Sequence, residues 1–139
     1  MKRRVRVLIG KPGLDGHERG AFVLIRTLRD HGMEVIYTGL RQTPEMIVQA
    51  SIQEAVDVIG LSILSGAHVE LVGKIMDLLK LNSAENIPVL VGGIIPNKDR
   101  ETLKRMGVKA IFGPGTSTQQ IVDAVNSCVG EWPAENHQS

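Results

Sequence analysis

The chain has 139 residues, a formal net charge of +1 and a single cysteine, Cys128. This length suits one domain with a buried core, and 42% hydrophobic with 22% charged residues is ordinary for a globular protein. The balanced charge excludes the strongly basic classes, so we expect no nucleic acid and no membrane partner. The lone cysteine excludes an internal disulfide, and without a signal peptide or an apolar span we expect a cytoplasmic protein.

Short apolar runs rich in β-branched residues alternate with segments whose apolar residues recur at helical spacing. The expected strands are residues 4–9, 34–37, 57–64, 87–91 and 109–112. The expected helices are residues 17–31, 44–55, 68–81, 97–106 and 118–129. Thr43 before Pro44 is typical of a helix start, and Gly32 and Gly107 stand where helix C-caps are expected. Residues 1–129 therefore form the predicted domain, and residues 130–139, which show no periodicity, are an expected flexible tail.

Apolar strands that alternate with helices are typical of a parallel sheet covered on both faces. The pattern predicts an α/β, flavodoxin-like (Rossmann-like) doubly wound fold with a five-stranded parallel sheet in the order 2-1-3-4-5. In this order the loop after the first strand should lie beside residues 62–66. Open sheets of this kind bind ligands at the carboxyl ends of their strands, where these two loops would meet.

A glycine-rich loop, residues 10–20, follows the first expected strand. Within it Asp15 stands two residues before His17, so its carboxylate can accept one ring N–H and leave the other nitrogen as a metal ligand. The alternative is a histidine that caps the next helix or faces solvent, which the adjacent carboxylate and glycines disfavour. No second His, Cys or carboxylate follows at a spacing suited to zinc. A single protein ligand suits a metal whose other positions are filled by a macrocycle.

The pattern Asp15-x-His17-x-x-Gly20, preceded by Lys11, resembles the cobalamin-binding signature of the adenosylcobalamin-dependent acyl-CoA mutases, the methylmalonyl-CoA mutase type above all. The resemblance implies that adenosylcobalamin is held with its own base off the cobalt and with His17 as the lower axial ligand. Lys11 would lie near Asp15 and keep that carboxylate ionised. The alternative for Lys11 is an exposed lysine at a strand end.

Two later motifs extend the resemblance, which covers roughly residues 4–126. Ser62-x-Leu64 resembles the second signature, in which the serine hydroxyl contacts a nitrogen of the displaced dimethylbenzimidazole, although alone it would be a strand end and a turn. Gly92-Gly93 resembles the third, which gives backbone clearance for the nucleotide tail, although glycine pairs also mark tight turns. The cofactor-binding residues implied by the resemblance are Lys11, Asp15, Gly16, His17, Gly20, Gly39, Ser62, Leu64, Gly66, Gly92, Gly93, Gly113, Gly115 and Thr116.

The role of the chain follows from what 139 residues cannot hold. The acyl-CoA site of the resembled enzymes is a separate (β/α)₈ barrel of several hundred residues. We therefore expect a cobalamin-carrying small subunit, with no residue acting directly on substrate, that docks on a large barrel-type, acyl-CoA-binding mutase subunit. The resemblance implies homolysis of the cobalt–carbon bond followed by a 1,2-rearrangement of the carbon skeleton, and methylmalonyl-CoA mutase is the expected enzyme.

Two alternatives remain at this stage. A corrinoid carrier of a methyltransferase, or a cobalamin-dependent sensor, would share the signature but usually has an additional helical cap domain. A receiver-like signalling domain would share the fold, but it needs an acidic cluster at the first loop and an aspartate at the end of the third strand. Here Asp57 begins that strand and Ser62 lies near its end.

Overall fold

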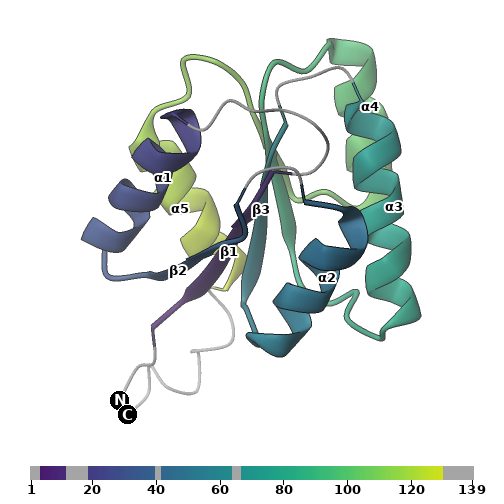
Figure 1. Ribbon diagram of the computed structural model, residues 1–139. Helices are drawn as coiled ribbons and strands as arrows, with labels where there is room; N and C mark the ends of the chain where they lie inside the picture. Colours follow the sequence, from purple (N-terminus) through teal and green to yellow (C-terminus); the bar gives the residue numbers. More distant parts are fainter. Residues whose placement is uncertain (1–3, 12–18, 40–41, 64–66, 130–139) are drawn as a thin grey trace.

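The computed structural model describes residues 4–11, 19–39, 42–63 and 67–129 (Figure 1). The strands are β1 (Arg6–Gly10), β2 (Glu34–Tyr37), β3 (Val58–Ser62), β4 (Val89–Gly92) and β5 (Ala110–Phe112). The helices are α1 (Arg19–Asp30), α2 (Pro44–Gln53), α3 (His68–Leu81), α4 (Asn97–Met106) and α5 (Thr118–Cys128). The expectation for residues 130–139 lies outside the described residues.

The strands pair in parallel in the order β2-β1-β3-β4-β5, which confirms the predicted doubly wound fold. At its centre Leu8 of β1 lies opposite Ile36 of β2 and Ile59 of β3. The chain changes direction across the sheet between β1 and β3, so the carboxyl ends of these two strands form the expected binding edge.

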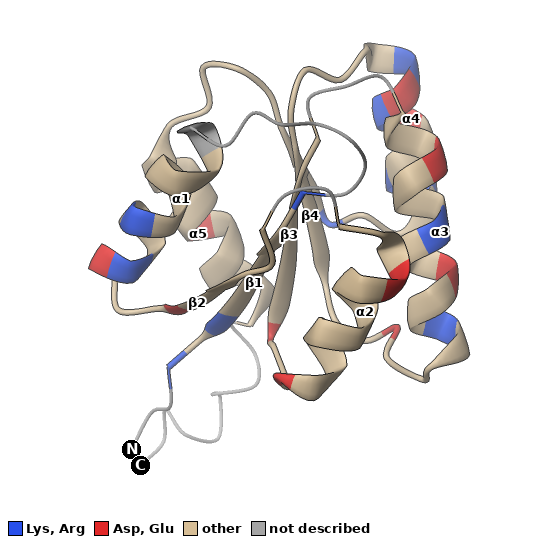
Figure 2. Cartoon of the chain, in the orientation of Figure 1, with Lys and Arg blue, Asp and Glu red and all other residues tan. Residues whose placement is uncertain are grey.

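Helices α1 and α5 cover one face of the sheet, and α2, α3 and α4 cover the other (Figure 1). Strand residues alternate between the two resulting cores, as a pleated strand requires. On β3, Val58 packs with α1 and α5, whereas Ile59 and Leu61 pack with α2, α3 and α4. Acidic and basic side chains are mixed along α3 and α4 (Figure 2). Among the described helices, none is long and apolar enough to cross a membrane.

Helix boundaries follow local chemistry, some of it visible in the sequence. Thr43 Oγ1 accepts a hydrogen bond from Met46 N at 3.1 Å, which confirms the predicted start of α2. Gly107 ends α4 with a φ of 109°, as a left-handed C-cap should. Helix α2 ends at Gln53, earlier than expected, because Ala55 has a positive φ of 51°. Glycine or asparagine usually marks such a position in a sequence, and position 55 has neither.

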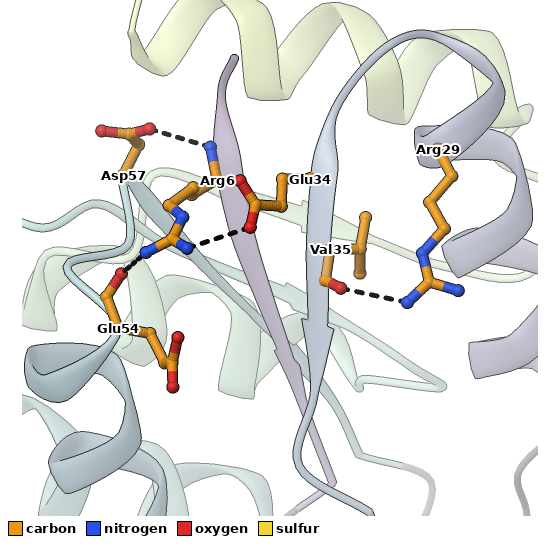
Figure 3. Close-up of polar contacts among 6 residues, drawn as sticks. All are labelled: Arg6, Arg29, Glu34, Val35, Glu54 and Asp57. Atoms are coloured by element: carbon orange, nitrogen blue, oxygen red, sulfur yellow. Dashed lines mark hydrogen bonds and ion pairs between the residues drawn. The ribbon is translucent and has the colours of Figure 1, made fainter. Parts of the chain in front are cut away.

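Polar contacts join the opposite, amino edge of the sheet (Figure 3). The guanidinium of Arg6 donates to Glu34 Oε2 at 2.9 Å and to the carbonyl of Glu54. The backbone N–H of Arg6 donates to Asp57 Oδ2 at 2.8 Å. These contacts connect β1 with β2, with the end of α2 and with the start of β3. Asp57 is thereby held just before β3, which begins at Val58, one residue later than expected.

The Arg6–Glu34 pair makes stability depend on pH. The hydrogen bond from Arg6 lowers the pKa of Glu34 below its ordinary 4.5. Because the pKa of Glu34 is lower in the folded state, its ionised carboxylate stabilises the folded state fully above about pH 4.5. This stabilisation is lost as the pH falls through the lowered pKa. In urea unfolding, wild type should therefore exceed Glu34→Gln in stability near neutral pH, and the difference should shrink in acid. Glu101→Gln is the control, because Glu101 forms an exposed ion pair with Arg105 at 3.5 Å. If the stability difference between wild type and Glu34→Gln did not change with pH, the role of the Arg6–Glu34 pair would be contradicted.

Candidate cofactor site

A cavity of about 80 Å³ lies between the sheet and helices α1 and α5, below the carboxyl edge. Strands β1, β3, β4 and β5 form its floor, and its walls are mainly aliphatic. Ser62, at the end of β3, brings a hydroxyl to this apolar surface, since Ser62 shares the face of Val58. The lining residues are Val7, Ile9, Ala21, Leu24, Leu28, Gly60, Leu61, Ser62, Leu90, Val91, Gly92, Phe112, Ile121 and Val125.

Gly92 and Gly93 follow Val91 of β4, and glycine has a different structural role at each position. Gly92 lines the cavity, and a Cβ there would come no closer than 3.9 Å to the carbonyl oxygen of Phe112. Packing does not require glycine at this position, so its missing side chain serves to leave space. Gly93 has a φ of 150°, and a Cβ there would lie 1.9 Å from the carbonyl oxygen of Ile63. Glycine at position 93 is therefore needed for β3 and β4 to end side by side.

Lys11 is buried, with 1% of its surface exposed. Its Nζ lies 3.4 Å from both the hydroxyl and the carbonyl oxygen of Ser62. The alternative of an exposed lysine at a strand end is therefore wrong. A buried ammonium requires polar partners, and this one brings the ends of β1 and β3 together. The sequence predicts that the loops after β1 and β3 lie side by side, and the contact between Lys11 and Ser62 confirms this where the two loops begin.

Other predicted site residues lie around the same edge. Thr116 Oγ1 donates to the carbonyl of Gly113 at 2.8 Å, which closes the turn after β5, and Gly115 within it has a φ of 89°. Gly39 follows β2 with a φ of 94°, and Gly20 lies in the first turn of α1. Five predicted site residues lie outside the described part of the chain: Asp15, Gly16, His17, Leu64 and Gly66.

Two residues near this edge carry no signal in the sequence. Arg100 of α4 reaches over β5, and its Nη2 would lie 2.8 Å from a Cβ at Gly113. His68, the first residue of α3, is buried and contacts the carbonyl of Ile63. An arginine in a charged helix and a histidine at a helix start are both ordinarily solvent-exposed, so pattern alone does not distinguish them.

Residues 5–123 match the family model described as the B12 binding domain. The chain belongs to this family. The 2-hydroxyisobutanoyl-CoA mutase small subunit of Aquincola tertiaricarbonis is 45% identical over 125 residues, which cover 90% of this chain and 92% of that protein. The pivalyl-CoA mutase small subunit of Xanthobacter autotrophicus is 43% identical, covering 90% of this chain and 84% of that protein. Methylmalonyl-CoA mutase of Escherichia coli is 41% identical over 93% of this chain, which spans 18% of that protein.

Solved structures show the same fold at low sequence identity. A cobalamin-binding protein from Desulfitobacterium hafniense superposes with a TM-score of 0.79 at 21% identity, covering 92% of this chain and 60% of that one. A response regulator from Chloroflexus aurantiacus superposes with a TM-score of 0.73 at 16% identity, covering 93% of this chain and 100% of that one. At the end of β3 the B12-binding domain has Ser62, and Asp57 binds Arg6 at the opposite edge. The aspartate expected for a receiver is thus missing from this strand end.

The two glycines after Val91 should respond differently to substitution. Gly93→Ala should destabilise the fold by at least about 1–3 kcal/mol, because the methyl group meets the Ile63 carbonyl and φ is unfavourable. Gly92→Ala should change stability by less than about 0.5 kcal/mol, because its Cβ meets only ordinary contacts. Chemical unfolding of both variants measures this, and equal losses would show that the close approach of β3 and β4 is not what requires glycine.

Proposed function

We propose that this chain is the cobalamin-binding small subunit of an adenosylcobalamin-dependent acyl-CoA mutase. The observation that carries the proposal is similarity to two proteins named as mutase small subunits, of which the chain covers 92% and 84%. The same sequence covers 16–18% of larger proteins named as mutases. In this proposal a separate subunit binds the acyl-CoA substrate.

The cavity suits the nucleotide end of cobalamin. Its aliphatic walls would hold the flat dimethylbenzimidazole, and Gly60 and Gly92 keep side chains out of the space. The Ser62 hydroxyl offers a hydrogen bond to a ring nitrogen, which would otherwise be buried without a partner. The turn from Gly113 to Thr116 would line the phosphate and ribose.

The cobalt ligand in this proposal is His17, with Asp15 accepting the other ring N–H and keeping the imidazole oriented. Lys11 lies where β1 leads into that loop, and its ammonium would keep Asp15 ionised while it also contacts Ser62. When bound, adenosylcobalamin would supply the radical chemistry of the carbon-skeleton rearrangement. The chain's own residues bind and orient; none acts on the substrate.

The substrate in this proposal is an acyl-CoA, and the sequence-based preference for methylmalonyl-CoA is only partly supported. The relatives include proteins named for 2-hydroxyisobutanoyl-CoA, pivalyl-CoA, ethylmalonyl-CoA and methylmalonyl-CoA. Residues that choose among these would lie in the partner, because in this proposal the partner binds the acyl-CoA.

The partner would be a larger catalytic subunit whose (β/α)₈ barrel covers the corrin. Large apolar side chains are exposed close to the carboxyl edge, which supports docking there. Ile94 after β4 is 62% exposed and Met46 in the first turn of α2 is 50% exposed. Phe22 and Val23 of α1 are also about half exposed. These side chains would be available for burial against such a partner.

The axial ligand can be tested on the isolated chain. We expect His17→Ala to lose the protein nitrogen that ligates cobalt, whereas Asp15→Asn should keep it and weaken cobalamin binding by about 10–100-fold. Electron paramagnetic resonance of the cob(II)alamin form with ¹⁵N-labelled protein identifies the ligand, and titration followed by visible absorbance gives the affinity. Circular dichroism checks folding. Wild-type spectra without protein-nitrogen splitting would refute the assignment of His17.

The subunit role can be tested by activity. The isolated chain with adenosylcobalamin should not isomerise any of the four acyl-CoA substrates named above. Together with the larger protein that co-purifies with it, turnover should appear, because only then are cofactor and thioester in one site. The larger protein with cofactor but without this chain is the control. Rapid turnover by the isolated chain would place the active site within it and contradict the proposal.

A further inference from the structure

His68 makes a contact that its position at the start of α3 does not require. Only 1% of its surface is exposed, and its Nε2 lies 3.2 Å from the carbonyl oxygen of Ile63. A carbonyl oxygen only accepts hydrogen bonds, so this geometry assigns the proton to Nε2. Nδ1 is then a bare lone pair, and within the described residues it is buried without a hydrogen-bond partner. The bond to Ile63 is the polar contact that holds the buried imidazole in this orientation.

The same carbonyl lies at the junction of β3 and β4. Ile63 N donates to the carbonyl of Gly92 at 3.0 Å. A Cβ at Gly93 would lie 1.9 Å from Ile63 O and 3.6 Å from His68 Nε2. Ile63 is therefore fixed on its N–H side by β4 and on its carbonyl side by the imidazole, with Gly93 leaving the room for both.

The residue before Ile63 is the polar residue of the cavity. Side chains alternate across a strand, so Ile63 packs among α2, α3 and α4 whereas Ser62 lines the cavity on the α1 and α5 side. A shift of the Ile63 backbone would also move its chain neighbour Ser62, whose hydroxyl lies 3.4 Å from Lys11 Nζ. The imidazole thus acts from one face of the sheet on a hydroxyl that serves the other face.

We propose that His68 is a positioning residue for the cofactor's base: by fixing the Ile63 carbonyl it aims Ser62 into the cavity. This inference rests on the proposed function, because it takes the occupant of the cavity to be the dimethylbenzimidazole of cobalamin. It requires that loss of the His68–Ile63 bond weakens binding of a corrinoid with a base and leaves binding of one without it nearly unchanged.

The experiment compares aquocobalamin with cobinamide, a corrinoid that lacks the nucleotide, by absorbance titration of the full chain. Wild type should prefer cobalamin. His68→Leu should weaken cobalamin binding by about tenfold and cobinamide binding by less than about twofold, as expected for one misplaced hydrogen bond. His68→Gln, whose amide N–H can take the place of Nε2–H, should restore most of the preference. If His68→Leu does not fold, His68→Asn is used in its place, because asparagine keeps a polar side chain that is too short to reach Ile63.

Two controls separate positioning from a general loss of stability. Ile75→Val removes buried volume from the same helix away from the cavity, and it should lower the unfolding temperature without changing the ratio of the two affinities. In a double-mutant cycle, His68→Leu should have little further effect on cobalamin binding once Ser62→Ala is present. Additive effects in the cycle, or equal weakening of both ligands by His68→Leu, would overturn the positioning role. A wild-type chain that binds both ligands equally would instead overturn the proposed use of the cavity, whatever the variants do.

Discussion

The carbonyl of Ile63 occupies the space in which any residue other than glycine at position 93 would place its Cβ. This close approach lets β3 and β4 end together, and it fixes the backbone from which Ser62 faces the cavity. The buried ammonium of Lys11 connects the Ser62 hydroxyl to the end of β1. Within the described residues, the carboxyl edge is therefore organised by backbone geometry and by the buried ammonium of Lys11.

The two edges of the sheet divide stability and binding between them. At the amino edge, Arg6 joins β1 to β2, to α2 and to the start of β3 (Figure 3). At the carboxyl edge, strand ends carry glycines and leave space. A parallel sheet permits this division because all of its strands end at the same edge, so the helices can close the core while that edge remains adapted to a ligand.

Much of the fold could be predicted from the sequence because the signals are local. Alternation of apolar runs and helical periods indicates the parallel sheet, and Thr43 before Pro44 marks a helix start. The different reasons for Gly92 and Gly93 could not be predicted, since they depend on what lies opposite each Cα in space. Burial of Lys11 and of His68 escaped prediction for a related reason. Polar partners in the folded chain, Ser62 for Lys11 and Ile63 for His68, make a polar side chain tolerable inside, and no spacing rule reveals them.

The cavity has a consequence for how long the protein lasts in a cell. It interrupts the packing between the sheet and α1 and α5, beside core residues such as Ile9 and Leu28. Helices that cover a cavity are expected to separate from the sheet in local opening, and a ligand held there favours the closed form more strongly as its concentration rises. Proteolysis acts on open forms, so scarcity of cofactor should shorten the lifetime of the subunit itself, and its abundance should follow cofactor supply without any change in its synthesis.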